Sequence, residues 1–187
     1  TEVPVIKQNA YPYMYITEVQ AQTLSESFTE KLDGYTSSLM FGVQWNLIMK
    51  YIETKEVEKA VAAGQDKETA LTNAQYILIV DSSSWGNYLN SQYTITGKYA
   101  AKTWGASWTT GTYTKSSSHS VYLGTGISDR FSKQNIYELA GNALEWTLEG
   151  NVAQSGEAIH RGAKHDESTS SAFPNIVASL RSRNYGG

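Results

Sequence analysis

The middle of the chain, residues 81 to about 132, is the part that most limits the folds open to this sequence. It consists largely of Ser, Thr, Gly, Tyr and Trp, as in the run Trp-Gly-Ala-Ser-Trp at 104–108. Ser and Thr compete for backbone hydrogen bonds and Gly is conformationally loose, so this composition disfavours long helices. Large aromatic rings bury area without needing regular structure. We therefore expect loops and short strands pinned by aromatic side chains; an aromatic sugar-binding platform is the alternative.

Helical periodicity lies on the N-terminal side of that segment. Thr17 and Gln20 have the spacing of a capping box, and apolar residues recur at helical intervals up to Gly34, which predicts a first helix. A second helix is expected over roughly 41–53. Residues 56–72 fit either a surface helix or a loop. The apolar residues on the buried side of the second helix are Trp45, Ile48, Met49 and Ile52.

Three further runs have strand character. Residues 1–7 predict a short edge strand, because Pro4 cannot donate to a sheet ladder, and residues 11–16 predict a second strand. Residues 76–80 favour a strand on propensity, with a short helix as the alternative. These elements predict an α+β fold in which two helices pack on a small twisted antiparallel sheet and much of the chain lies in loops.

Composition and charge exclude several classes of protein. The chain has 187 residues, 40% apolar and 12% aromatic, which is typical of one folded domain and not of a disordered segment. Its 15 Lys and Arg against 18 Asp and Glu give a net charge of -3, which argues against a nucleic-acid partner. No apolar run approaches the roughly 20 residues that cross a bilayer, so we expect no membrane insertion.

Cysteine is absent from the sequence, so the chain has no disulfide, no thiolate nucleophile and no cysteine metal ligand. The chain begins with Thr1, not Met, and no charged-then-apolar signal segment follows. We therefore expect a processed form or a fragment.

The most specific motif is Asn-Ile-Tyr-Glu-Leu-Ala-Gly-Asn-Ala-Leu-Glu-Trp-Thr at 135–147. It resembles the Gly-Asn-Val-Trp-Glu-Trp signature of the formylglycine-generating enzyme (sulfatase-modifying factor) superfamily, a branch of the C-type lectin-like fold. Residues 12–28, 39–45 and 160–163 resemble other landmarks of that superfamily, in the same order. The resemblance implies a single C-type lectin-like domain over residues 1–187. It also implies a closing Gly-Phe-Arg strand, which this chain would lack.

A metal site is predicted at the turn inside this motif. Glu138 and Glu145 flank the Gly141-Asn142 dipeptide, and carboxylates beside exposed turn carbonyls suit a hard cation such as calcium. The resemblance implies a calcium site as well, whose ligands correspond to Glu138, Gly141, Ala143 and Glu145. The alternative is that Glu145 holds the turn through hydrogen bonds to loop amides.

Catalysis is weighed against the same resemblance. The eponymous enzyme oxidises a substrate cysteine with a pair of copper-binding cysteines, which this chain lacks. Another branch builds an iron centre from histidines, but we interpret His119, His160 and His165 as unconnected surface residues. No serine-hydrolase, zinc-protease or phosphate-binding motif is present. We predict that the chain is not an enzyme; an oxidase of the copper or iron type is the alternative.

Non-catalytic members of the superfamily include the variable proteins of diversity-generating retroelements. The resemblance implies a ligand- or receptor-binding display protein on a phage particle or bacterial surface, with a protein or glycan partner on another cell or molecule. A non-variable structural domain of a cell-surface protein is the other alternative. The diversified segment would correspond to residues 163–185, which show no helical or strand period and therefore predict a surface loop.

Partner contacts are predicted in this segment, and framework residues in the motif before it. Phe173 and Tyr185 are the expected energetic anchors, because aromatic rings offer much contact area for few frozen torsions; burial of Phe173 in the core is the alternative. The predicted framework is Ile136, Leu139, Leu144 and Trp146. The predicted contacts are Lys164, His165, Asp166, Glu167, Phe173, Asn175, Val177, Ser179, Ser182, Asn184 and Tyr185.

Overall fold

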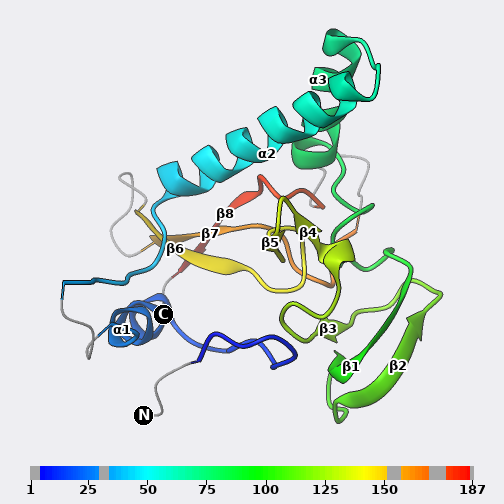
Figure 1. Cartoon of the computed structure of the whole chain (residues 1–187). Helices are drawn as coiled ribbons and strands as arrows, with labels where there is room; N and C mark the ends of the chain where they lie inside the picture. Colours follow the sequence, from blue (N-terminus) through cyan, green and yellow to red (C-terminus); the bar gives the residue numbers. More distant parts are fainter. Residues whose placement is uncertain (1–4, 30–33, 151–156, 169–175, 186–187) are drawn as a thin grey trace.

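The computed structural model of the chain describes residues 5–29, 34–150, 157–168 and 176–185 (Figure 1). These residues form three α-helices, a short 3-10 helix and eight strands. The helices are α1 (Glu18–Ser27), α2 (Gly42–Ala62), α3 (Lys67–Ile79) and the 3-10 helix η1 (Asp129–Phe131). The strands are β1 (Tyr93–Lys102), β2 (Thr109–Lys115), β3 (Tyr122–Leu123), β4 (Ser132–Lys133), β5 (Ile136–Tyr137), β6 (Glu145–Gly150), β7 (Glu157–Arg161) and β8 (Arg181–Tyr185).

The strands form three small antiparallel sheets with the orders β2-β1-β3, β4-β5 and β6-β7-β8. This confirms the α+β class. Two details of the prediction were wrong: the described residues contain three helices where two were expected, and three separate sheets where one was expected.

The first helix begins where the capping box predicted it. The Thr17 hydroxyl accepts a hydrogen bond from the Gln20 amide at 3.2 Å, and the Gln20 side chain accepts one from the Thr17 amide at 2.9 Å. These two bonds satisfy donors that a helix start otherwise leaves free. The helix ends at Ser27, before the predicted limit at Gly34.

Helices α2 and α3 pack against each other and correct two predictions. Trp45, Met49 and Ile52 are buried as expected, but α2 continues to Ala62. Residues 56–72 are therefore the end of one helix and the start of the next. Residues 76–79 are the last turn of α3, so the preferred strand was wrong. The buried residues of α3 are Ala70, Ala74 and Leu78, whose spacing of four places them on one helical face, and this packing outweighs local β-propensity.

The N-terminal arm, residues 5–16, contains no strand, although strands were predicted over 1–7 and 11–16. The arm is tied to the rest of the chain by isolated bonds. Asn9 N–H donates to the Thr125 carbonyl at 2.9 Å, and Thr125 N–H donates to the Ala10 carbonyl at 2.7 Å. Tyr11 and Tyr15 are mostly exposed, so the apolar run does not mark a buried strand face.

Residues 81–132 contain longer strands than expected. β1 and β2 form a hairpin in which Tyr93 pairs with Lys115 and Gly97 with Gly111. Alternate residues of β1, such as Tyr93 and Ile95, point into a core that also contains Val121, Leu123 and Phe131. A second core lies under α2 and α3 and includes Trp45, Ile52, Tyr88, Leu139 and Ile176.

Within the C-terminal segment, residues 176–178 are buried and residues 181–185 form a strand, which the sequence pattern did not predict. β8 pairs with β7 from Arg161–Arg181 to Glu157–Tyr185 and is an edge strand of that sheet. Ile176 and Ala178 are fully buried, and the Trp45 indole donates to the Ala178 carbonyl at 3.0 Å. A surface loop over all of 163–185 was therefore wrong, because the pairing partner is distant in sequence.

We expect Ile176→Ala to lower the free energy of unfolding by about 2–5 kcal/mol, because it opens a cavity under α2. Ser179→Ala, three residues on and partly exposed, is the matched control and should change it by less than about 0.5 kcal/mol. Urea denaturation measures both. Equal, small effects would mean that this segment is not packed into the core.

Candidate functional site

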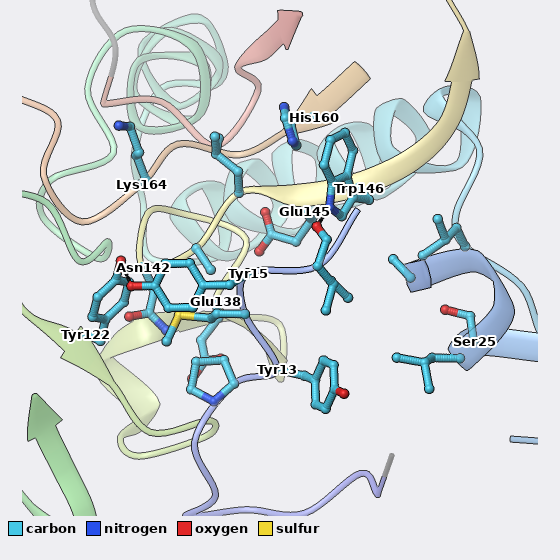
Figure 2. A pocket seen from close by; sticks show the side chains of 18 of the residues that line it. Tyr13, Tyr15, Ser25, Tyr122, Glu138, Asn142, Glu145, Trp146, His160 and Lys164 are labelled. Atoms are coloured by element: carbon cyan, nitrogen blue, oxygen red, sulfur yellow. Dashed lines mark hydrogen bonds between the residues drawn. The ribbon is translucent and has the colours of Figure 1, made fainter. Parts of the chain in front are cut away.

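A pocket of about 730 Å³ lies between the N-terminal arm, α1 and the start of β6 (Figure 2). Its wall contains residues from both predicted sites: Glu138, Ala143 and Glu145 from the metal site, and Lys164 and His165 from the contact segment. Three of the four predicted metal ligands and two of the eleven predicted contact residues therefore line one cavity. Aromatic side chains also line it, namely Tyr13, Tyr15, Phe28, Tyr122 and Trp146.

The turn at Gly141 and Asn142 sets the position of the acidic residues. Both residues are left-handed, with φ of 76° and 67°. A Cβ on Gly141 would lie 2.2 Å from the Asn87 carbonyl oxygen, so only glycine fits. The Asn142 side-chain oxygen accepts hydrogen bonds from the Asn87 side chain at 3.0 Å and from the Leu123 amide at 2.8 Å. The predicted reversal is thus held by a buried amide network.

Glu138 and Glu145 both lie in the pocket wall, close enough for their negative charges to repel each other. Glu138 accepts a hydrogen bond from the Gly126 amide at 2.7 Å, and burial raises its pKa to about 7. Burial, followed by repulsion from Glu138, raises the pKa of Glu145 well above its usual range. The buried Oε2 of Glu145 has no hydrogen-bond partner among the described residues. A Cβ on Gly162 would lie 2.6 Å from that oxygen, so this glycine makes room for the carboxylate.

Calcium at these oxygens stays a prediction from the sequence. Calcium takes several oxygen ligands, and two adjacent carboxylates supply charge while loop carbonyls complete the shell. No hydrogen bond from a described residue engages the carbonyl of Gly141 or Ala143. No group of three or more His, Cys, Asp or Glu side chains gathers among the described residues, so carbonyls would have to contribute. Glu145 Oε2 makes no hydrogen bond to a loop amide of the described residues, so it is free either to carry a proton or to bind a cation.

Two of the three histidines are buried, so their interpretation as surface residues was wrong. The His160 ring lies 3.8 Å from the Trp146 ring, and burial lowers its pKa. His165 Nδ1 lies 2.6 Å from the Ser120 hydroxyl, and burial lowers the pKa of His165 to about 4. Desolvation disfavours the charged imidazole, so His165 is neutral at pH 7.

The predicted contact residues divide into exposed and buried groups. Lys164 and Asp166 form an exposed ion pair at 3.2 Å, and Glu167 is half-buried with its pKa raised to about 7 by burial. Val177 is only 5% exposed and does not line the pocket, which corrects that assignment, whereas His165 is 6% exposed but lines the pocket. Ser179 and Ser182 are partly exposed, Phe173 and Asn175 lie outside the described residues, and Asn184 and Tyr185 are described only as backbone of β8.

Arg161 is a positioning residue, although in the sequence it stands out only as part of the landmark at residues 160–163. It is 4% exposed, and its Nε lies 3.1 Å from Glu149 Oε2. Its Nη2 donates to the Asn46 side chain at 3.0 Å and to the Gly42 carbonyl at 3.3 Å. Arg161 therefore joins the first turn of α2 to β6 and β7. The signal that could have revealed this role is an arginine next to a glycine that a turn requires.

The chain matches no family model, no curated protein and no solved structure. The lectin-like type of fold and the superfamily therefore stay expectations from the sequence. Within the described ranges, no helix has the length and apolar character to cross a membrane.

We expect excess chelator to lower the melting temperature of protein purified with calcium, because an ion that binds only the folded state stabilises the folded state by mass action. Thermal unfolding with and without added calcium measures the effect. Glu138→Gln should abolish the calcium response and, in chelator, should raise the melting temperature by removing repulsion with Glu145. A melting curve that chelator leaves unchanged would contradict the calcium prediction.

Stability in chelator should also depend on pH. A carboxyl group whose pKa is higher in the folded than in the unfolded state binds its proton more tightly when folded. The free energy of unfolding should therefore fall as pH rises from about 4.5 to 7, with Glu138 contributing up to about 3 kcal/mol. Urea titrations across this range measure the slope, and Glu138→Gln should flatten it. An equal slope in the variant would assign the dependence to other groups.

Proposed function

We propose that this chain is a non-catalytic binding domain that holds its ligand at the pocket and at the start of the C-terminal segment beside it. The supporting observation is the lining of the pocket, which includes Lys164 and His165, two of the contact residues predicted from the sequence. A cavity of about 730 Å³ with aromatic walls and a few convergent polar groups is typical of ligand sites.

The arrangement of residues after β7 supports presentation on a rigid base. Arg161 and Ala163 are buried, whereas Lys164 and Asp166 reach solvent. Buried side chains hold the backbone in place while their neighbours face outward. Binding residues are commonly carried in this way, on loops that a scaffold positions.

The finer proposal is a retroelement-diversified variable protein of a phage or bacterial surface that binds a protein or glycan partner. It rests on the resemblance of residues 135–147 and on the absence of cysteine, without which the copper oxidase chemistry cannot be assembled. In this proposal Glu138, Gly141, Ala143 and Glu145 hold calcium. The ion would neutralise the two carboxylates and brace the pocket wall.

The binding proposal predicts that the exposed positions tolerate replacement. Joint substitution of Lys164, Asp166, Ser179 and Ser182 should leave the melting temperature within a few degrees, because exposed polar residues contribute little to stability. A library randomised at these positions should yield variants with different ligand preferences in a selection experiment. Val177→Ser, at a buried neighbour, is the control expected to destabilise. Unfolding of the polar variant would contradict the proposal.

Diversification has a separate test in the gene neighbourhood. A reverse transcriptase gene and an imperfect repeat of the segment encoding residues 163–185 should lie nearby. Their absence would favour the alternative of a non-variable structural domain.

A further inference from the structure

Five aromatic residues of the N-terminal arm and the β1–β2 hairpin make two groups of ring contacts, Tyr11 with Tyr99 and Trp108, and Tyr15 with Trp104. Trp104 and Trp108 belong to the same hairpin turn, and the five residues are together called here the aromatic surface. The Tyr11 ring lies 5.6 Å from that of Tyr99 and 6.3 Å from that of Trp108. The Tyr15 ring lies 5.7 Å from that of Trp104. These contacts fix how the rings face solvent, because each ring is held by a neighbour from a distant segment.

The rings are exposed to a degree that folding alone does not explain. Trp104 is 77% exposed, Tyr15 71% and Tyr11 59%. Exposed aromatic area forgoes the free energy that its burial would provide, and clusters of such area mark interaction sites. Tyr15 also has a φ of 61°, a left-handed conformation that is strained for an aromatic residue. Strain held by the surrounding structure points to a functional constraint at Tyr15.

The β1–β2 hairpin, which carries three of the five rings, contains lysines and no carboxylate in a chain of net charge -3. The sequence has no Asp or Glu from Ser82 to Ser128, whereas Lys98 and Lys102 lie on β1. Lys98 is exposed and its Nζ lies 5.2 Å from the centre of the Tyr99 ring. A ligand that stacks on the rings would therefore meet cations and no carboxylate of this segment.

We propose that the aromatic surface binds an acidic carbohydrate. A sugar ring presents a face of C–H groups that packs on the electron-rich face of an aromatic ring. Its hydroxyl groups remain at the edge for hydrogen bonds, here with the exposed Thr103 and Ser107 of the hairpin turn. A carboxylate or sulfate on the sugar pairs with Lys98.

A nucleic acid fits this surface less well than an acidic sugar. A phosphate backbone is bound by a track of many cations, and this surface offers two lysines. The proposal rests on the binding function proposed above and names the ligand class. Tyr15 lines the pocket as well, so the sugar would lie next to the contact residues already assigned.

The test is titration of the intact chain with oligogalacturonate and with sialyllactose, using maltohexaose as the neutral sugar and oligothymidylate as the nucleic acid. Calorimetry should detect binding of at least one acidic sugar and weaker binding of maltohexaose. Trp104→Ala should raise the dissociation constant about tenfold or more, because loss of a stacked aromatic anchor commonly lowers affinity by at least that factor. Lys98→Gln should weaken the binding of the acidic sugar and leave the binding of maltohexaose unchanged.

Two control variants match these changes at a distance from the aromatic surface. Tyr76→Ala removes a half-exposed aromatic ring from α3, and Lys67→Gln removes an exposed charge from the same helix. Both should leave sugar affinity within about twofold. Trp104→Ala should keep the wild-type melting temperature, because its side chain is mostly exposed.

Three outcomes would overturn the proposal: no acidic sugar binds, Tyr76→Ala weakens binding as much as Trp104→Ala, or oligothymidylate binds more tightly than every sugar. If no acidic sugar binds but library variants at Lys164 and Asp166 select ligands, the ligand class is wrong and the binding function stands. If neither binding is found, both proposals fail.

Discussion

The buried amide pair Asn87–Asn142 is the interaction on which the rest of the structure depends. The Asn87 side chain donates to the Val121 carbonyl at 2.7 Å and accepts from the Tyr93 hydroxyl at 2.8 Å, both in or beside the hairpin core. Asn142 bonds Asn87 and Leu123 from the turn that leads into β6. The pair therefore ties the two cores together. An unpartnered buried amide costs about 1–3 kcal/mol, so each member of the network depends on the others.

The acidic residues of the pocket follow from this arrangement. The turn held by Asn142 places Glu145 at the start of β6, and Gly162 leaves space for its carboxylate. Arg161 directly precedes Gly162, but its guanidinium group binds Glu149 and the Gly42 carbonyl in the first turn of α2. Glu138 and Glu145 are thus left with no cationic partner among the described residues. Burial raises the pKa of both carboxyl groups, which favours their neutral, protonated forms; in the calcium proposal, a bound cation would balance their charge instead.

The N-terminal arm connects the two proposed binding surfaces. Tyr15 lies in the wall of the pocket, contacts Trp104 of the aromatic surface and shares a hydrogen bond with the Tyr122 hydroxyl at 3.2 Å. The ring of Tyr122 in turn lies 3.7 Å from that of His165. Tyr15 therefore belongs to both proposed surfaces.

The sequence by itself determined the features that depend on near neighbours. The capping box at Thr17, the buried face of α2 and the left-handed turn at Gly141 all involve partners within a few residues or a fixed spacing, so local patterns predict them. Only the tertiary structure decided the features with distant partners. Residues 76–79 are helical because α3 packs on α2, and His165 is buried against Ser120 and Tyr122, which are distant in the sequence. The aromatic surface likewise arises from rings about 90 residues apart, and no local pattern brings an arm and a hairpin together.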